Sequence, residues 1–559
     1  MLSYRKLAMR VLGRPLHTGG GIDSPRPASQ RAAAFALTAA MLITLTAPAF
    51  AETWYIENGD ITVKASGTEG KNTVSQGDKK DVEDTNTIIT NQKTDKASSH
   101  TVTIDAGNDK VEVTLDNVNI KADSGSALIS KGDVTLTLKG DNHLTGGNGG
   151  SSSYGGDGIT SSGSLTISGG TVNANGGDGK NGSGGGSGID SSGGVTVSGG
   201  TVTANGGDGG SGSGSHGGNG IYSSSGVAIS GGAVTANGGD SKDGSGGNGI
   251  YSSGGVTISS GSTVTANGGN GEDGSGGRGI TSNGGVIVSG GTVNAKGGSG
   301  KNGNGGDGIR SFNPVAISGG TVNANGGDSK DGSGGNGIYS SGSVAISGGT
   351  VTANGGNGGT NSGGYGIISK DIDLSGSLEL TAKAGSPNGK ALSRAGHEFD
   401  LDTIKDKLDP GAKVTTTDAD GKVIQQVSIP RPVEPEKPVI PGDSSSSSGG
   451  GSADASVQES VFPGLVVTDK DGQRISYTSI RGNNVLSLSV GRFTASLHAS
   501  LSTLRQLRAA GIDTITFQTI LCSTTLSVDE LLAMGGEDTE VVLTHHIRSS
   551  TLTVGGKAV

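Results

Sequence analysis

Acidic side chains recur in the glycine-rich stretches of this chain, where they could supply oxygen ligands to a metal ion. They are Asp240, Asp243, Asp273, Asp328 and Asp331. Calcium takes about six to eight oxygens from carboxylates and backbone carbonyls, and flexible glycine-rich loops can wrap it. Residues 268–273 also resemble one copy of a calcium-binding nonapeptide, without the nine-residue recurrence. The pattern makes calcium a candidate cofactor; the alternative is that aspartate simply occupies turn positions.

Three tyrosines each follow the isoleucine of a repeated glycine–isoleucine phrase: Tyr222, Tyr251 and Tyr339. An aromatic ring suits a sugar face because its body is apolar while its hydroxyl stays in contact with water. We therefore treat the three as candidate carbohydrate-binding residues. The alternative is that they are ordinary surface tyrosines.

Catalysis has little support in the sequence. Basic residues of the glycine-rich stretch, such as Arg278 and Arg310, look scattered, and no repeat departs from the pattern to build a separate site. The prediction is that the protein is not an enzyme. A polysaccharide lyase or hydrolase stays open as an alternative, because two carboxylates at a suitable distance can arise in any acid-rich stack of loops.

A fixed period positions these residues. Glycine followed by isoleucine recurs in steps of 29 to 32 residues, at Ile159, Ile189, Ile221, Ile250, Ile280, Ile309, Ile338 and Ile367. Such a period is the signature of stacked repeats. Within residues 249–266, three short segments place apolar residues at a spacing of two, which indicates strands rather than a helix. The sequence therefore predicts an all-β fold, a parallel β-helix whose isoleucines point inward and whose tyrosines point outward.

The composition supports a thin core and limits the partners. Of 559 residues 110 are glycine, and only 30% are hydrophobic and 3% aromatic, which is poor material for an ordinary globular domain. The net charge of −10 disfavours nucleic acid and an anionic membrane surface as partners.

The chain divides into five segments. Residues 1–51 read as a signal peptide, because Arg26 and Arg31 precede an apolar run over residues 32–47, and residues 49–51, Ala-Phe-Ala, offer small residues at the cleavage positions. Residues 52–145 are expected to form an N-terminal cap and the first coils, and residues 146–385 the glycine-rich repeat array. Residues 386–453 read as a transition and a Pro/Ser/Gly linker, and residues 454–559 as a small α+β domain. No later apolar stretch is long enough to span a membrane in the mature chain.

The repeats resemble a known family. Residues 248–259, which read Asn-Gly-Ile-Tyr-Ser-Ser-Gly-Gly-Val-Thr-Ile-Ser, and the strand pattern of residues 111–120 are similar to secreted clostridial and gut-bacterial β-helix proteins that contain carbohydrate-binding domains. The resemblance covers residues 54–385. It implies a right-handed parallel β-helix, bound calcium and affinity for acidic plant polysaccharide.

These observations lead to three functional expectations. The first is a secreted or cell-surface protein that binds polysaccharide or a cell-surface glycan, with calcium as a possible requirement. The second is a structural or adhesin-type surface protein in which the β-helix is a spacer. The third is the polysaccharide-cleaving enzyme.

Overall fold

The structure is a computed structural model that describes residues 52–430 and 464–558, with short gaps. The gaps are residues 69, 152, 213, 470, 471, 476, 483, 491–493, 520–522, 537, 538 and 547–549. The predicted signal peptide and residues 431–453 of the predicted transition and linker lie outside the described residues. The chain forms two compact units, Met1–Pro435 and Glu436–Val559, and each is described by itself.

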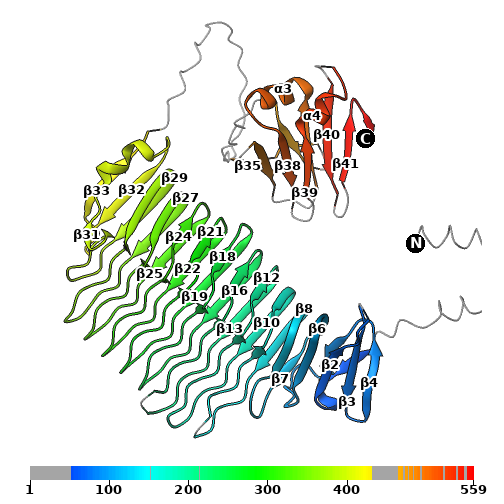
Figure 1. Ribbon diagram of the computed structural model, residues 1–559, viewed down its shortest axis with the longest axis vertical. Coiled ribbons are helices and arrows are strands. Elements are labelled where there is room, and N and C mark those ends of the chain that lie inside the picture. Colours follow the sequence, from blue (N-terminus) through cyan, green and yellow to red (C-terminus); the bar gives the residue numbers. More distant parts are fainter. Residues whose placement is uncertain are drawn as a thin grey trace, which may run out of the picture. The chain divides into compact units, whose positions relative to one another are not determined.

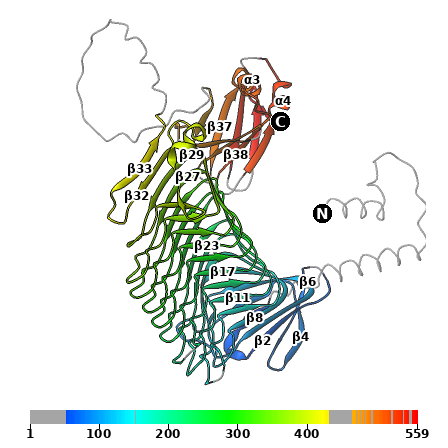
Figure 2. The same ribbon diagram turned by 60° about the vertical axis from the view of Figure 1, so that its left-hand side comes forward.

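The first unit is a parallel β-solenoid with three strand ladders (Figures 1 and 2). Strands of the first ladder begin at the repeated isoleucines, and like residues lie beside like, as in Ile221↔Ile250↔Ile280. This ladder contains β9 (Ile159–Ser161), β11 (Ile189–Ser191), β14 (Ile221–Ser223), β17 (Ile250–Ser252), β20 (Ile280–Ser282), β23 (Ile309–Ser311), β26 (Ile338–Ser340) and β28 (Ile367–Ser369). The predicted parallel β-solenoid is therefore confirmed.

The other two ladders complete each turn. The second contains β12 (Val195–Val197), β15 (Val227–Ile229), β18 (Val256–Ile258), β21 (Val286–Val288) and β24 (Val315–Ile317). The third contains β13 (Thr201–Asn205), β16 (Gly232–Asn237), β19 (Ser262–Asn267), β22 (Thr292–Lys296) and β25 (Thr321–Asn325). Three longer strands each take part in both the second and the third ladder: β10 (Leu165–Asn175), β27 (Ser343–Asn354) and β29 (Asp371–Lys383).

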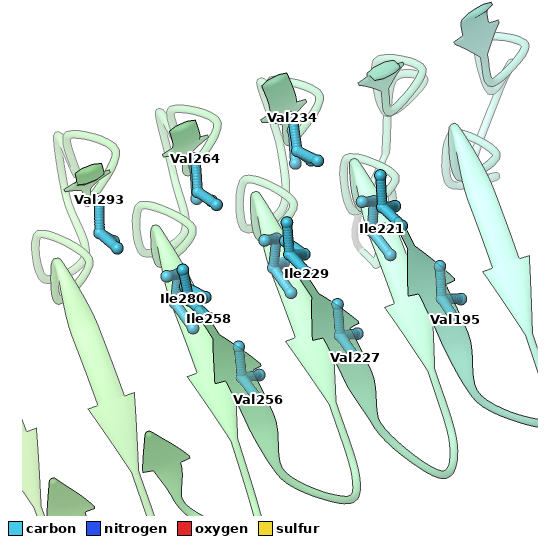
Figure 3. Close-up of a cluster of buried hydrophobic side chains, with 14 of the residues drawn as sticks. Val195, Ile221, Val227, Ile229, Val234, Val256, Ile258, Val264, Ile280 and Val293 are labelled. Atoms are coloured by element: carbon cyan, nitrogen blue, oxygen red, sulfur yellow. The ribbon is translucent and has the colours of Figure 1, made fainter. Parts of the chain in front are cut away.

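The core is a column of aliphatic side chains, one set per turn. All eight repeat isoleucines are fully buried, and Val256, Ile258 and Val264 join them within one turn. Figure 3 shows the same positions repeated from turn to turn. At the outer end of the third ladder a row of asparagines adds a polar ladder: Asn237 Nδ2 donates to Asn205 Oδ1, and Asn267 Nδ2 donates to Asn237 Oδ1, each at 2.8 Å.

Antiparallel strands close both ends of the solenoid. At the N-terminal end β2 (Ile61–Ala65) pairs with β3 (Asn72–Gln76), and β3 pairs with β4 (Lys79–Asp84). The first turns contain β1 (Thr53–Tyr55), β5 (Ile88–Thr90), β6 (Val102–Asp116), β7 (Asn119–Lys121) and β8 (Leu128–Thr145). At the C-terminal end β32 (Lys413–Thr417) extends the third ladder and pairs with β33 (Val423–Ser428). Residues 386–428, expected as a transition, thus complete the solenoid, which also contains β30 (Leu392–Arg394), β31 (His397–Glu398) and η2 (Leu401–Lys407).

Between the third and first strands of each turn the chain makes a long excursion, seen as the regular row of loops in Figure 1. We call its two halves the outgoing and returning limbs. Their glycines are hydrogen-bonded alternately: Gly277 N–H donates to Gly269 O, and Gly269 N–H donates to Gly247 O, each at 2.8 Å. This column continues without a break from Gly385 to Gly125. The limbs are therefore packed layers rather than free loops.

The second unit is an α+β fold, as expected. One sheet contains β34 (Val466–Thr468), β37 (Ala495–Ser500), β40 (Glu540–His545), β41 (Ser550–Val554) and β42 (Lys557–Ala558), and the other β35 (Thr478–Gly482), β36 (Val485–Ser489), β38 (Thr514–Gln518) and β39 (Ser523–Ser527). The helices are α3 (Leu501–Ala509) and α4 (Val528–Leu532). Ser527 caps α4 by accepting a hydrogen bond from Glu530 N–H, at the position that the sequence indicates.

Candidate functional site

The candidate site lies where each returning limb joins the first strand. The chain there reads Gly-Gly-x-Gly-Ile-y, and the side chains at x and y vary from turn to turn. We call these side chains the corner row. The x positions are Asp157, Ser187, Asn219, Asn248, Arg278, Asp307, Asn336 and Tyr365. The y positions are Thr160, Asp190, Tyr222, Tyr251, Thr281, Arg310, Tyr339 and Ile368.

Direct contacts join the x and y side chains. Thr160 Oγ1 donates to Asp157 Oδ2 at 2.7 Å, and Thr281 Oγ1 donates to Asn248 Oδ1 at 3.2 Å. The y side chain must point outward, because its neighbour is the buried isoleucine and side chains alternate along a strand. Most x and y residues are partly exposed and form a surface row along the solenoid, in which Ser187, Thr281 and Asp307 are buried.

The structure brings two of the three predicted tyrosines together. Tyr222 and Tyr251 occupy adjacent turns, and their rings stack with centroids 5.3 Å apart and planes 7° from parallel. Each ring therefore covers one face of the other, and the pair does not form a flat outward platform. Tyr339 lies apart from them, with the guanidinium carbon of Arg310 4.5 Å from the centre of its ring.

Beyond the tyrosine pair lies a basic cluster that the sequence did not reveal. Asp307 is buried and takes two cationic partners: Arg310 Nη1 at 3.1 Å and Arg278 Nε at 3.6 Å. Burial, and secondarily Arg310, lower the pKa of Arg278 from its ordinary value. A cavity of about 270 Å³ opens beside these residues and is also lined by Asn336 and Tyr365. Its volume is slightly below the usual range of about 300–1,000 Å³ for ligand pockets.

An acidic pair occupies the corner row on the other side of the tyrosines. Asp157 accepts hydrogen bonds from Thr160 and, at 2.7 Å, from the backbone N–H of Ser187. Burial raises the pKa of Asp157, and burial together with the charge of Asp157 raises the pKa of Asp190 to about 6. The corner row therefore contains acidic, aromatic and basic sections in sequence.

The arginines are not scattered, contrary to the interpretation of the sequence. Both arginines between residues 146 and 385, Arg278 and Arg310, lie in the corner row, as do four of the five tyrosines of that segment. Only Tyr154 lies elsewhere. Aligning all Gly-Gly-x-Gly-Ile-y phrases and comparing the residues at x and at y from turn to turn would have revealed this cluster from the sequence.

The five aspartates predicted to bind calcium lie outside the corner row, in two columns. Asp240 and Asp328 lie on outgoing limbs, where their Oδ1 atoms accept the backbone N–H of Asn270 and Asn357 of the next turn, each at 2.6 Å. The other three, Asp243, Asp273 and Asp331, lie near the loop tips. Among the described residues, no group of three or more His, Cys, Asp or Glu side chains could hold a metal ion. Calcium binding stays a prediction.

The comparisons with known proteins agree with the architecture. A family model for the β-helix repeat matches residues 165–187, 195–219 and 315–337. The array is built of β-helix repeats. No curated protein and no solved structure matches the chain. Within the part of the chain that is described, the β-helix protein has no helix long and apolar enough to cross a membrane. Since one fold supports many functions, the function of this β-helix must be argued from the corner row.

Proposed function

We propose that this β-helix is a secreted or cell-surface protein that binds a polysaccharide along its corner row. The supporting observation is the gathering of both arginines and four tyrosines of the array on one surface. At protein–protein interfaces, arginine and tyrosine are enriched among the residues that contribute most of the binding energy, and the amphipathic tyrosine ring also suits a sugar face. The fold does not require these residue types, because other turns carry serine, threonine or asparagine at the same positions.

The geometry of the row suits an extended polymer. Successive turns are about 4.8 Å apart, so the row offers regularly spaced contacts along the solenoid axis. A polysaccharide chain in this row would contact the ring edges and hydroxyls of Tyr222 and Tyr251. It would also contact the ring face of each tyrosine that the other ring does not cover, and further along it would reach Arg310. A calcium ion bound by the limb aspartates would act on the limbs rather than on the sugar contacts.

Binding to polysaccharide panels and pull-down on insoluble polymers, with added calcium and with chelator, test this proposal. Tyr222→Ala and Tyr339→Ala should each weaken binding about tenfold or more, since truncating a recognition aromatic costs roughly 2 kcal/mol. Tyr154→Ala is the matched control, because Tyr154 is highly exposed and lies outside the row. Failure to bind any polysaccharide, or equal binding by all four proteins, would refute the proposal. Reducing-end release from the same polymers tests the enzyme alternative.

The second candidate is a spacer that presents the other unit. The unbroken glycine column favours a stiff rod, and Glu436–Val559 has its own hydrophobic core. In that case a chain that lacks residues 436–559 would lose adhesion to its target surface. The corner-row variants would adhere as the parent protein does, which separates the two candidates.

A further inference from the structure

The corner row carries opposite charges at two places whose separation is set by the register. Along the first ladder the register partners in successive turns are Asp190, Tyr222, Tyr251, Thr281 and Arg310, so Asp190 and Arg310 are four turns apart. The x positions give the same separation, because Asp157 and Arg278 are also four repeats apart. At about 4.8 Å per turn, the acidic and basic pairs lie about 19 Å apart.

The acidic pair lacks a counter-charge. Asp157 is bonded only to neutral donors, the hydroxyl of Thr160 and the backbone of Ser187. Within the described residues, the carboxylate of Asp190 accepts no hydrogen bond, and neither aspartate forms an ion pair. Both side chains are partly buried. Two partly buried carboxylates of like charge leave a strong attraction for a cation that arrives from solution.

The basic pair has an excess of one positive charge. Arg278 and Arg310 share a single carboxylate, that of buried Asp307, which also accepts hydrogen bonds from the backbone and side chain of Asn336. The buried Nε of Arg310 has no hydrogen-bond partner in the described part of the chain. The cavity of about 270 Å³ gives an anionic group access to this pair.

The section between the two charged pairs is neutral. It contains the stacked ring pair and the amides of Asn219 and Asn248, which are bonded to each other at 3.0 Å. Sugar hydroxyls can pair with such amides and tyrosine hydroxyls without a charge of their own. One extended chain can therefore contact the acidic, aromatic and basic sections together.

We infer that the corner row selects a zwitterionic polysaccharide. Ammonium groups of the chain meet Asp157 and Asp190, and anionic groups of the same chain meet Arg278 and Arg310, about 19 Å further along. This inference rests on the proposed polysaccharide-binding function and adds the class of ligand.

Calorimetric titration of the full chain with matched polymers tests the inference. The probe is partly de-N-acetylated hyaluronan, which carries ammonium and carboxylate groups. Native hyaluronan is the anionic control, chitosan oligosaccharide the cationic control and acetylated chitin oligosaccharide the neutral one. We expect the zwitterionic polymer to bind about tenfold or more tightly than each control. The preference should shrink as salt rises, because exposed charge pairs are screened.

Variants separate the two charged ends. Asp190→Asn should lower the affinity for the zwitterionic polymer to that for hyaluronan and leave hyaluronan binding unchanged. Arg310→Gln should lower the affinity for the zwitterionic polymer to the affinity for chitosan oligosaccharide. Arg310→Lys should retain most of the affinity for the zwitterionic polymer. The controls are Glu272→Gln and Lys330→Gln, which remove exposed charges near the loop tips, outside the corner row and outside the predicted calcium ligands.

Each outcome decides the question. Equal affinity for native and de-N-acetylated hyaluronan overturns the inference while leaving the polysaccharide-binding proposal in place. Equal losses of affinity in Asp190→Asn and Glu272→Gln also overturn it, because a negative charge would then act wherever it lies on the surface. Absence of binding to all four polymers overturns the inference, and absence of binding to the whole polysaccharide panel overturns the proposed function as well.

Discussion

Replacing one glycine of the limb column should disrupt the packing between neighbouring turns of the array. A Cβ added at Gly277 would lie 1.8 Å from the carbonyl oxygen of Gly247 and 2.5 Å from its carbonyl carbon, both backbone atoms. Real Cβ contacts essentially never fall below 3.0 Å. The limb would have to move by about 1.2 Å, which is the difference between the 3.0 Å limit and the 1.8 Å contact. Both contacting atoms belong to the backbone, so no flexible side chain can absorb the shift.

The cost follows from the bonds that such a movement breaks. Gly277 N–H donates to Gly269 O, and Gly298 N–H donates to Gly277 O, both at 2.8 Å. A buried backbone group left without a partner costs about 1–3 kcal/mol, so losing both bonds costs about 2–6 kcal/mol. If both bonds survive, overpacking alone costs about 1–3 kcal/mol. Gly277→Ala should therefore lower the free energy of unfolding by several kcal/mol.

Gly255→Ala is the matched control for this change. Gly255 lies in the turn before β18, and a Cβ there would be 3.6 Å from its nearest neighbour, an ordinary contact. That substitution should be neutral or stabilising by about 0.4–1 kcal/mol, because alanine restricts the unfolded chain. Urea unfolding followed by circular dichroism compares the midpoints, and hydrogen exchange reports the limb amides directly. Equal midpoints for the two variants, with limb protection intact in both, would refute the packed-limb interpretation.

Three further predictions concern titration and the amide ladder. Burial, and secondarily Asp157, raise the pKa of Asp190 from 3.8 to about 6, so the folded state binds its proton more tightly and stability falls as pH rises from about 4 to 6. Asp190→Asn should remove this dependence and stabilise the array at pH 7 by about 1–2 kcal/mol, because Asp190 is partly exposed and solvent screens its charge; a gain that is the same at pH 4 and pH 7 would contradict this. Asn237→Ala breaks two amide bonds of its ladder and should cost about 1–3 kcal/mol in urea unfolding; an unchanged midpoint would argue against the ladder. Burial lowers the pKa of His545, so the second unit should lose stability as pH falls below 6.5, and His545→Asn should flatten that dependence in hydrogen exchange.

Much of the fold could be predicted from the sequence because each turn obeys the same local rules. The period placed Ile250 beside Ile280, and alternation placed Val256 and Ile258 inward, as the structure confirms. In a stacked repeat each unit contacts only its neighbours, so a pattern read within one turn extends to the whole array. In the second unit the cap at Ser527 also follows from a local pattern, because Glu530 stands three residues further along the chain.

The packing of the limbs could not be predicted in this way. Glycine-rich stretches read as flexible loops, because glycine has no side chain whose pattern would show a buried face. The close approach of Gly277 to Gly247 is visible only in three dimensions. The cluster of Arg278, Asp307 and Arg310 was missed for a related reason. Its members are 29 and 3 residues apart, and they meet only once the turns are stacked in register.

The packed glycine limbs and the varied side chains of the corner row have a common explanation. The limb glycines admit no side chain and the inward positions require aliphatic residues, so most positions of a turn have a fixed type. The x and y positions lie outside both constraints, at the junction of limb and strand. Charge and aromatic character can change there without disturbing the neighbouring turns. A β-helix of this kind can therefore set its ligand preference turn by turn, and the acidic, aromatic and basic sections are the order that this chain has adopted.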